Sequence, residues 1–437
     1  MLVAVNMIGT GIFLLPSTMA AYGSISILGW VGAAVGAAAI GLMFAVLGSL
    51  DPQPGGPYAY ARAAFGTYSG FQTNYVYWSA NLIGNVAVAT TVVGYLTEFF
   101  PALRVPLWGM VGGVVVVWLA ALANIVGPRF VGLLTGWITV VAMVPLTLIA
   151  VVGWVWFDPH VFLAGWNPDG LSPVSAVSAS ATSALWAFMG VESAAVAAGV
   201  IANPRRNVPL ATLLGLAIAT ALYVATCAVL MGIVPASELA RSEAPFSLAA
   251  ERALGTFGAF VIALAAILKS GASLVGWTLT IAQSAEAAAA DGMFPRLFAR
   301  VDRRGVPVLN YVVSAVLMTV IVVATASASL NAQFTEIIDM AIVLTLLPYL
   351  FTAVAFLGAC RAAGYSGWKA WLAGLVAFLA SAYCLWAVAS SEATLVRQAV
   401  IFLFLSVPFY WLCRGRGAPA DRSETPAGPD MAADRKS

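Results

Sequence analysis

Charged side chains are scarce in this sequence of 437 residues. Lysine, arginine, aspartate and glutamate make up 9% of it and hydrophobic residues 62%, whereas soluble domains contain roughly 25% charged residues. The mean hydropathy is +0.95. This composition excludes an ordinary soluble globular domain and indicates an integral membrane protein.

Cysteine and histidine are also rare. The four cysteines (Cys227, Cys360, Cys384 and Cys413) lie within or at the ends of hydrophobic runs, which predicts reduced packing residues without a disulfide or a metal site. The one histidine, His160, lies in the connection WFDPH and is expected at the surface. The hydrophobic runs carry no pair of nucleophile and base, no metal cluster and no phosphate-binding loop. We therefore expect neither an enzyme nor a bound cofactor.

Hydrophobic runs cover most of the chain, and a helix that spans a membrane needs about 20 apolar residues. A β-barrel is excluded because the runs are continuous and do not alternate. We predict an all-α integral membrane protein with twelve transmembrane helices in one domain, residues 1–413, followed by a disordered cytoplasmic tail, residues 414–437. The runs are 1–21, 27–50, 69–97, 106–127, 130–157, 175–199, 208–234, 255–285, 307–327, 334–358, 365–390 and 395–413.

The basic residues are unevenly distributed among the connections. Most fall in alternate connections or after the last run, and only Arg104, Arg241, Arg252 and Arg397 fall in the others. Connections rich in lysine and arginine stay in the cytoplasm, so we expect both termini there. No charged start precedes a small-residue cleavage site, so no cleavable signal peptide is predicted. Because Met1 lies inside the first run, we expect either a start site placed too late or a truncated chain.

The stretch VNMIGTGIF, residues 5–13, interrupts the first run. Glycine is costly inside a helix, and Gly9 and Gly11 flank Thr10, whose hydroxyl competes for backbone hydrogen bonds. An unwound segment in lipid leaves backbone groups unpaired, so it is tolerated only where it lines a cavity or contacts a ligand. The alternative is a close helix crossing through small residues.

A second stretch of this kind, LWAFMGVESAAV, interrupts the sixth run at residues 185–196. Its FMGVE aligns with MIGTG of the first run with the glycines superposed, and the two runs are predicted to cross the membrane in opposite directions. Such a pair indicates an inverted repeat with a binding site at the midplane. The repeats would be about residues 1–157 and 175–358, with the helices at 365–413 appended.

The ends of interrupted helices predict a class of ligand. Free N–H groups at a helix start suit a carboxylate, and free carbonyls at a helix end suit an ammonium group. An amino acid zwitterion carries both. Thr10 and Gly11 would face the carboxylate, and the carbonyls of Met7, Trp186 and Met189 would face the ammonium group.

With these stretches the sequence resembles the amino acid, polyamine and organocation transporter family, in its basic amino acid/polyamine antiporter branch. Bacterial arginine/agmatine antiporters are the most similar type. The resemblance runs from Met1 to about Cys413 on NMIGTGIFLLP, LDPQPGGPYAYARAAFG, FQTNYVYW followed by IGN, NIVGP, LWAFMGVESAAVAAGVIANPRRNVP, GWTLTIAQ, DGMFPRLFARVDRRGVP and LLPYL.

The resemblance implies exchange of an external basic amino acid for its internal decarboxylation product by alternating access in the bacterial inner (plasma) membrane. Arginine and agmatine are the first expectation, with a link to acid resistance or polyamine metabolism. Lysine/cadaverine exchange, ornithine/putrescine exchange and proton-coupled amino acid uptake are the alternatives. The expected partners are these small molecules, membrane lipid and a second copy of the chain, without nucleic acid. A sensor would add a soluble signalling domain, and none is evident.

The resemblance also implies the residues of the site. Trp186 would close over the substrate from outside and Trp277 would lie beneath it, although tryptophan in membrane helices also anchors at interfaces. Asn81 and Ala341 stand where the arginine antiporters have Cys and Ser, which puts the substrate pair in question. The implied substrate-binding residues are Asn6, Met7, Gly9, Thr10, Gly11, Ala80, Asn81, Asn85, Trp186, Met189, Trp277 and Ala341, and Tyr77, Glu192 and Tyr349 are implied in gating and the response to pH.

Charges inside a bilayer are expensive and usually functional. Glu192 follows the glycine of the second break, where it can cap free N–H groups or take up a proton that shifts a gate. Glu336 and Asp339 share one helix face, where they suit a helix start or attract cationic substrates. Lys269 is the one basic residue far inside a predicted span. It would pair with one of these carboxylates, or its ammonium group would replace a bound cation.

Overall fold

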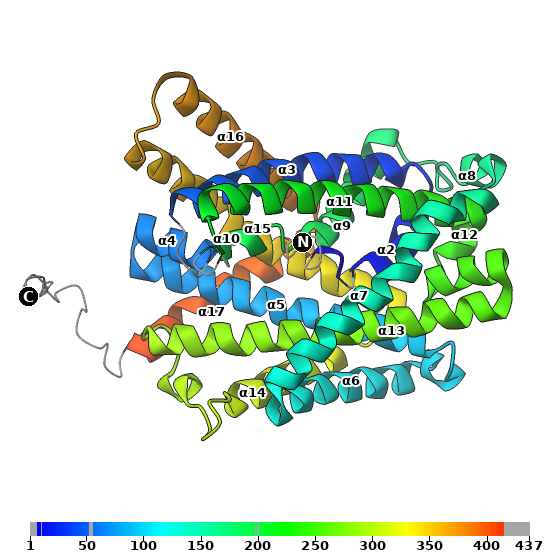
Figure 1. Ribbon diagram of the computed structural model, residues 1–437, viewed down its shortest axis with the longest axis horizontal. Coiled ribbons are helices and arrows are strands. Elements are labelled where there is room, and N and C mark those ends of the chain that lie inside the picture. The colour runs from blue at the N-terminus through cyan, green and yellow to red at the C-terminus, as the bar shows by residue number, and fades with distance from the viewer. Residues whose placement is uncertain (1–6, 10, 52–55, 197, 199–200, 415–437) are drawn as a thin grey trace, which may run out of the picture.

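The structure is a computed structural model, and it describes residues 7–9, 11–51, 56–196, 198 and 201–414. Helices are the only regular secondary structure in these ranges. Most of them run along the longest axis of the molecule, with α4 and α10 at one end and α8 and α12 at the other (Figure 1). The predicted all-α fold is confirmed.

The helices are joined by short connections, and prolines mark many of their starts. A proline in the first turn lacks an N–H that would have no helical partner there. The helices are α2 (Gly11–Tyr22), α3 (Ser26–Leu50), α4 (Pro57–Phe65), α5 (Thr67–Leu96), α6 (Pro106–Val126), α7 (Pro128–Val152), α8 (Pro159–Ala164), α9 (Pro173–Phe188), α10 (Ser193–Val196), α11 (Pro204–Ile233), α12 (Ala236–Leu239), α13 (Pro245–Ala290), α14 (Val308–Ala324), α15 (Leu330–Ala362), α16 (Gly367–Ser390) and α17 (Ala393–Arg414), with short 3-10 turns at Pro101–Arg104, Gly153–Trp156 and Arg296–Ala299.

Ten of the described helical segments are long and apolar enough to cross a membrane. Two further apolar helices, α2 and α14, are shorter. Together they overlap the twelve predicted runs, taking α9 and α10 as the two halves of the sixth, and the count of twelve transmembrane helices stays a prediction. The described chain is thus a multi-pass helical membrane protein.

Helix α13 begins earlier than the sequence predicted. The run was expected from residue 255, but α13 starts at Pro245 and changes direction at Gly255, whose φ of 75° favours glycine. The ten residues before the bend include Glu251 and Arg252, and these charges made the segment resemble a connection. They lie at an exposed end of the helix.

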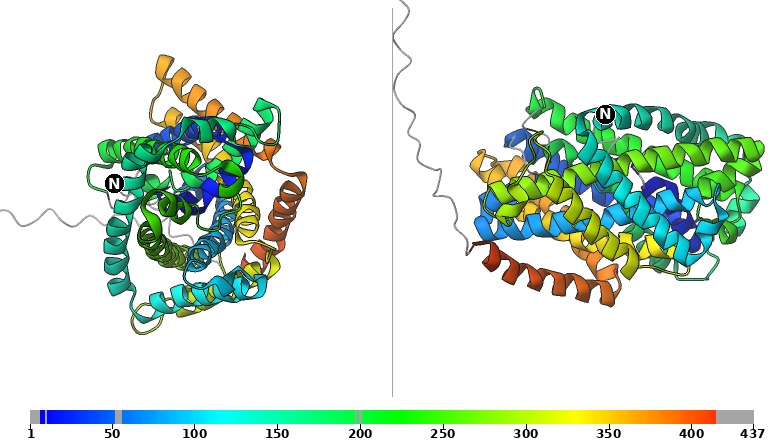
Figure 2. Two further views of the ribbon diagram at one scale, coloured as in Figure 1. Left: turned by 90° about the vertical axis from the view of Figure 1, so that its right-hand side faces the viewer. Right: turned by 90° about the horizontal axis from the view of Figure 1, so that it is seen from below.

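Helix α5 lies at the centre of the bundle. It packs against α13 and α15, while α3 packs against α9 and α11. Most of α5 is buried, whereas little of α17 is. Viewed along the long axis, α16 and α17 lie at the periphery (Figure 2). The two interrupted segments and the middle of α5 therefore lie away from the periphery.

Candidate functional site

The sixth span is interrupted as predicted. Helix α9 ends at Phe188, Met189 is extended, and Gly190 has a φ of 99°, which favours glycine. The helix resumes as α10 at Ser193. The break therefore falls on the glycine that the alignment with the first span singled out.

The first span is irregular at the corresponding place. Ile8 and Gly9 form a bend, the Gly9 N–H donates to the Met7 carbonyl at 2.6 Å, and α2 begins at Gly11. Asn6 and Thr10 lie outside the described residues. The described part of this segment agrees with the predicted break.

One hydroxyl group connects the two breaks. The Oη atom of Tyr223, on α11, lies 2.5 Å from the Met7 carbonyl oxygen and 2.9 Å from the Ala187 carbonyl oxygen. Tyr223 is fully buried, with its ring against Trp30 and Phe188. The sequence analysis missed this residue, and its one signal was a phenol in an otherwise apolar run.

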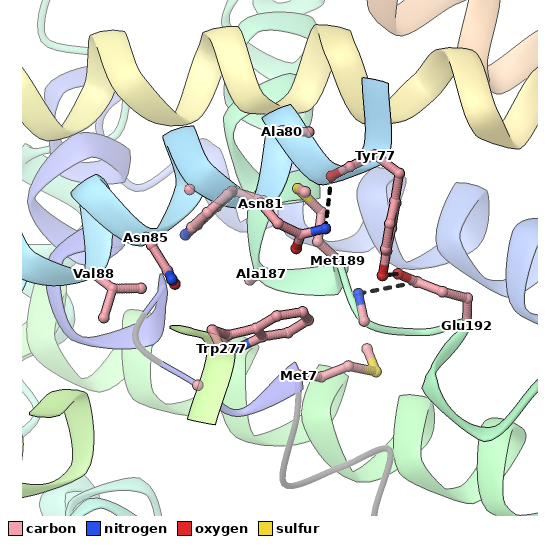
Figure 3. Close-up of a pocket in the computed structure, with 14 residues that line it drawn as sticks. Met7, Tyr77, Ala80, Asn81, Asn85, Val88, Ala187, Met189, Glu192 and Trp277 are labelled. Carbon is pink, nitrogen blue, oxygen red and sulfur yellow. Dashed lines mark hydrogen bonds between the residues drawn. The ribbon is translucent and has the colours of Figure 1, made fainter. Parts of the chain in front are cut away.

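A cavity lies between the two breaks, α5 and α13 (Figure 3). Many of the predicted site residues line it, whereas the buried Ala341 does not. Gly84, Val88, Ala187 and Gly190 line it without having been predicted. The lining residues are Met7, Gly9, Tyr77, Ala80, Asn81, Gly84, Asn85, Val88, Trp186, Ala187, Met189, Gly190, Glu192 and Trp277.

Two asparagines on α5 present oxygen atoms on this side of the cavity. The Asn81 amide Nδ2 donates to the Tyr77 carbonyl at 2.7 Å, and Figure 3 shows its Oδ1 turned toward the cavity. One turn further, Asn85 Nδ2 donates to the Thr278 hydroxyl at 3.4 Å. Each amide thus uses one of its two N–H donors in these bonds, and its oxygen can accept a hydrogen bond from a ligand.

The two predicted tryptophans come from different sides. Trp186, on α9, packs its ring against Gly84, where an added Cβ would lie 2.7 Å from the ring. Trp277, on α13, extends across the cavity near Ala187 in Figure 3. Gly84 lies one turn from Asn81 on the same helix, and this spacing was the signal that could have found it.

The three residues implied in gating meet at one edge of the cavity. Glu192 Oε1 accepts from the Tyr77 hydroxyl at 3.0 Å, and Oε2 accepts from the Tyr349 hydroxyl at 2.7 Å and the Gly190 N–H at 3.1 Å. The carboxylate thus caps the break and also joins α5 to α15. Glu192 is 2% exposed.

The expected pairing of Lys269 with a carboxylate on α15 does not form. Lys269 is fully buried and its Nζ donates to Ser273 Oγ at 2.9 Å, one turn along α13. Within the described ranges it makes no ion pair. Glu336 is exposed, and Asp339 Oδ1 is buried without a hydrogen-bond partner among the described residues. The nearer hydroxyl takes the place of the expected carboxylate.

The amino acid permease family model matches residues 1–413. The chain belongs to this family. Its curated relatives include the cadaverine/lysine antiporter of Escherichia coli strain K12, which is 38% identical over 357 residues, or 80% of each chain. The putrescine transporter PotE of the same strain is 36% identical over 416 residues, or 95% of this chain and 94% of PotE. This family is one of transporters, so the expectation that the chain is no enzyme is confirmed.

A solved structure shares the fold at much lower identity. The manganese transporter of Eremococcus coleocola, as the mutant H236A, has a TM-score of 0.59 and 14% sequence identity, and the match covers 94% of this chain and 92% of that one. The likeness concerns the arrangement of helices alone.

Proposed function

We propose that this permease exchanges an external basic amino acid for its internal decarboxylated amine, with lysine and cadaverine as the pair. The observation that carries the proposal is the cavity between two helix breaks, lined by two tryptophans and by oxygen acceptors. None of its described lining residues is basic. Such a cavity suits a ligand with positive charge at its ends.

The lining offers two ways to bind a cation. Trp186 and Trp277 present aromatic rings, and a cation over such a ring gains about 0.5 to 2 kcal/mol. Asn81 Oδ1 and the carbonyls at the breaks accept hydrogen bonds from an ammonium group. Because the product lacks the carboxylate of the amino acid, contacts with the cationic groups must supply much of the affinity for both.

The relatives favour diamine pairs over arginine and agmatine. The names of the relatives described above refer to cadaverine, lysine and putrescine. The chain also has Asn81 and Ala341 where the resemblance to arginine antiporters implies Cys and Ser. Of the exchanges that the resemblance implies, we therefore propose lysine/cadaverine exchange first. Ornithine/putrescine exchange and arginine/agmatine exchange follow it.

The hydrogen bonds of Glu192 suggest how one side of the cavity closes. Tyr77 belongs to α5, Glu192 to the sixth span and Tyr349 to α15, so the two phenol contacts hold three spans together. Opening between these spans would break at least one contact, and protonation of Glu192 would weaken both. We therefore assign Tyr77, Glu192 and Tyr349 to the gate.

From the distribution of basic residues among the connections, we also propose that both termini lie in the cytoplasm of a bacterial cell.

Uptake of labelled lysine into proteoliposomes tests the proposal. The vesicles are preloaded in turn with cadaverine, putrescine, agmatine, lysine or nothing, with and without sodium. We expect cadaverine and lysine inside to stimulate uptake and sodium to have no effect. Stimulation by agmatine alone would restore arginine/agmatine exchange. Uptake into empty vesicles driven by a proton gradient would replace exchange with proton-coupled uptake.

A further inference from the structure

The hydroxyl of Tyr223 is within hydrogen-bond distance of one backbone carbonyl from each break. Its Oη is 2.5 Å from the Met7 carbonyl oxygen and 2.9 Å from the Ala187 carbonyl oxygen. Met7 and Ala187 both line the cavity. The hydroxyl therefore acts on backbone groups within reach of a ligand.

Both carbonyls lie where the helical pattern of hydrogen bonds is interrupted. In a continuous helix the Ala187 carbonyl would accept from the N–H of Val191, but that N–H donates to the Phe188 carbonyl at 3.2 Å. The Met7 carbonyl accepts from the Gly9 N–H, two residues on, at 2.6 Å, and a carbonyl has a second lone pair. An unpaired carbonyl in a membrane interior is costly, so the Ala187 carbonyl needs another donor.

Tyr223 cannot satisfy both carbonyls at once. A phenol has a single proton to donate, whereas a primary ammonium group has three. The ring is held by Trp30 and Phe188, with centroids 5.1 and 5.5 Å away, so the hydroxyl stays between the two carbonyls. The carbonyl that the phenol does not serve therefore keeps a lone pair open to an N–H donor from the cavity.

We infer that Tyr223 is a positioning residue for the ammonium group of the substrate. Its hydroxyl donates to one break carbonyl while the ammonium group donates to the other, so a loaded cavity satisfies both breaks and fixes them relative to each other. The inference rests on the proposed function, because it needs a substrate with a primary amine. It extends the site to α11, which the sequence analysis did not include.

The variant Tyr223→Phe tests the inference, because it keeps the ring and removes only the hydroxyl. We expect the dissociation constants of lysine and cadaverine, measured by calorimetry on the purified protein, to rise about tenfold, which corresponds to ~1.4 kcal/mol or one hydrogen bond. The KM for exchange should rise with them, and the maximal rate should change little. If the role of Tyr223 were purely structural, the variant would have a lower melting temperature, but the KM would not rise separately from the maximal rate.

Tyr95→Phe is the matched control. Tyr95 is also fully buried, and its hydroxyl donates to the Phe13 carbonyl on α2 at 2.8 Å, beyond the break. This variant should lower the melting temperature while both dissociation constants stay within about twofold. Equal losses of affinity in the two variants, or unchanged affinity in Tyr223→Phe, would overturn the inference.

The wild-type protein offers a test that needs no variant. Cadaverine with fully methylated nitrogens keeps its charges but has no N–H donors, and aromatic rings bind quaternary ammonium well. Affinity at least about tenfold below that of cadaverine supports N–H donation to the break carbonyls. Equal affinity would overturn it. If the wild type bound neither lysine nor any of the amines, the proposed function itself would fail, and the variants would not be needed to show it.

Discussion

At the scale of single residues, the cavity depends on small side chains as much as on polar ones. Gly84 on α5 allows the Trp186 ring to approach the helix backbone, and a Cβ added there would lie 2.7 Å from that ring. Ala80, one turn before it, and Ala187, opposite, are also small. The tryptophan is therefore placed by the absence of a side chain on the neighbouring helix.

Replacing Gly84 by alanine should displace Trp186 and weaken binding. The end of the ring would have to shift to make room for the added methyl group, so we expect the KM for both exchange partners to rise several-fold, about 1 to 2 kcal/mol of lost contact. Kinetics of exchange in proteoliposomes measure this. Gly358→Ala on α15 is the control, because no atom lies within 4 Å of its added Cβ. An unchanged KM in Gly84→Ala would show that the ring position does not matter.

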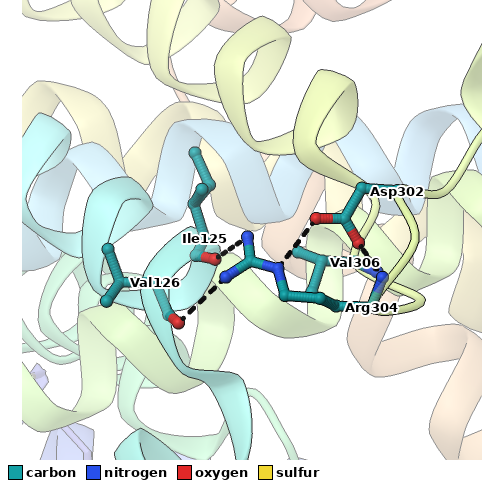
Figure 4. Close-up of polar contacts among 5 residues, drawn as sticks. All are labelled: Ile125, Val126, Asp302, Arg304 and Val306. Atoms are coloured by element: carbon teal, nitrogen blue, oxygen red, sulfur yellow. Dashed lines mark hydrogen bonds and ion pairs between the residues drawn. The ribbon is translucent and has the colours of Figure 1, made fainter.

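At the scale of elements, connections fix the ends of the helices. Arg304 lies in the connection between α13 and α14 and contacts the last two residues of α6 (Figure 4). Its Nη2 donates to the Ile125 carbonyl at 3.0 Å and its Nη1 to the Val126 carbonyl at 3.4 Å. Its Nε donates to Asp302 at 3.0 Å. Hydrogen bonds from the backbone N–H of Val306, which has the larger effect, and of Arg304 lower the pKa of the Asp302 carboxyl. This connection thus holds α6 beside α13 and α14.

The connection between α12 and α13 is held in a similar way at the other end of the bundle. The Ser17 hydroxyl donates to the Ser242 carbonyl at 2.7 Å, and Glu243 Oε1 accepts from the Leu330 N–H at 3.3 Å. Glu243 Oε2 is buried without a hydrogen-bond partner among the described residues. Burial, the largest influence, raises the pKa of the Glu243 carboxyl above its ordinary value.

The raised pKa predicts a stability that depends on pH. Because the folded state binds the Glu243 proton more tightly than the unfolded state, its stabilising contribution is complete below the unfolded pKa and is lost as the pH rises through the folded pKa. Glu243→Gln is neutral at every pH, so its melting temperature should fall less than that of the wild type between acid and neutral pH. Thermal unfolding in detergent at a series of pH values measures this.

Glu251→Gln serves as the control for that series. Glu251 is exposed on α13 near the same connection, so its replacement changes the net charge equally without removing a buried carboxyl. Its melting curve should follow the wild type at each pH. If Glu243→Gln also followed the wild type, burial of Glu243 would not affect stability.

The sequence predicted the interrupted spans because glycines there have a local cost that can be read directly. The gating roles of Tyr77, Glu192 and Tyr349, in contrast, came from the family resemblance, and only the structure shows that the three residues meet. Tyr223 and the partner of Lys269 were missed for a physical reason. A membrane span is apolar on every side, so its pattern does not show which face turns inward. Only packing against other helices decides that Tyr223 reaches two carbonyls and Lys269 reaches a hydroxyl.

At the scale of the whole molecule, the proposed exchange moves charge as well as solute. Lysine enters with one net positive charge and cadaverine leaves with two, so each cycle carries one positive charge outward. A membrane potential acts on that charge with about 2.3 kcal/mol per 100 mV. A potential that is positive inside should therefore accelerate lysine/cadaverine exchange, and one that is negative inside should slow it.

Potassium diffusion potentials imposed on proteoliposomes test this expectation. Lysine/lysine exchange in the same vesicles is the control, because equal charges cross in both directions and no net charge moves. A potential that changed both exchanges equally would mean that the carrier itself moves charge, through groups such as Glu192 or Lys269, which lie inside the spans. If the potential changed neither exchange, a proton would accompany lysine inward and balance the second positive charge of cadaverine. That result would link the Glu192 carboxyl to the transport step itself.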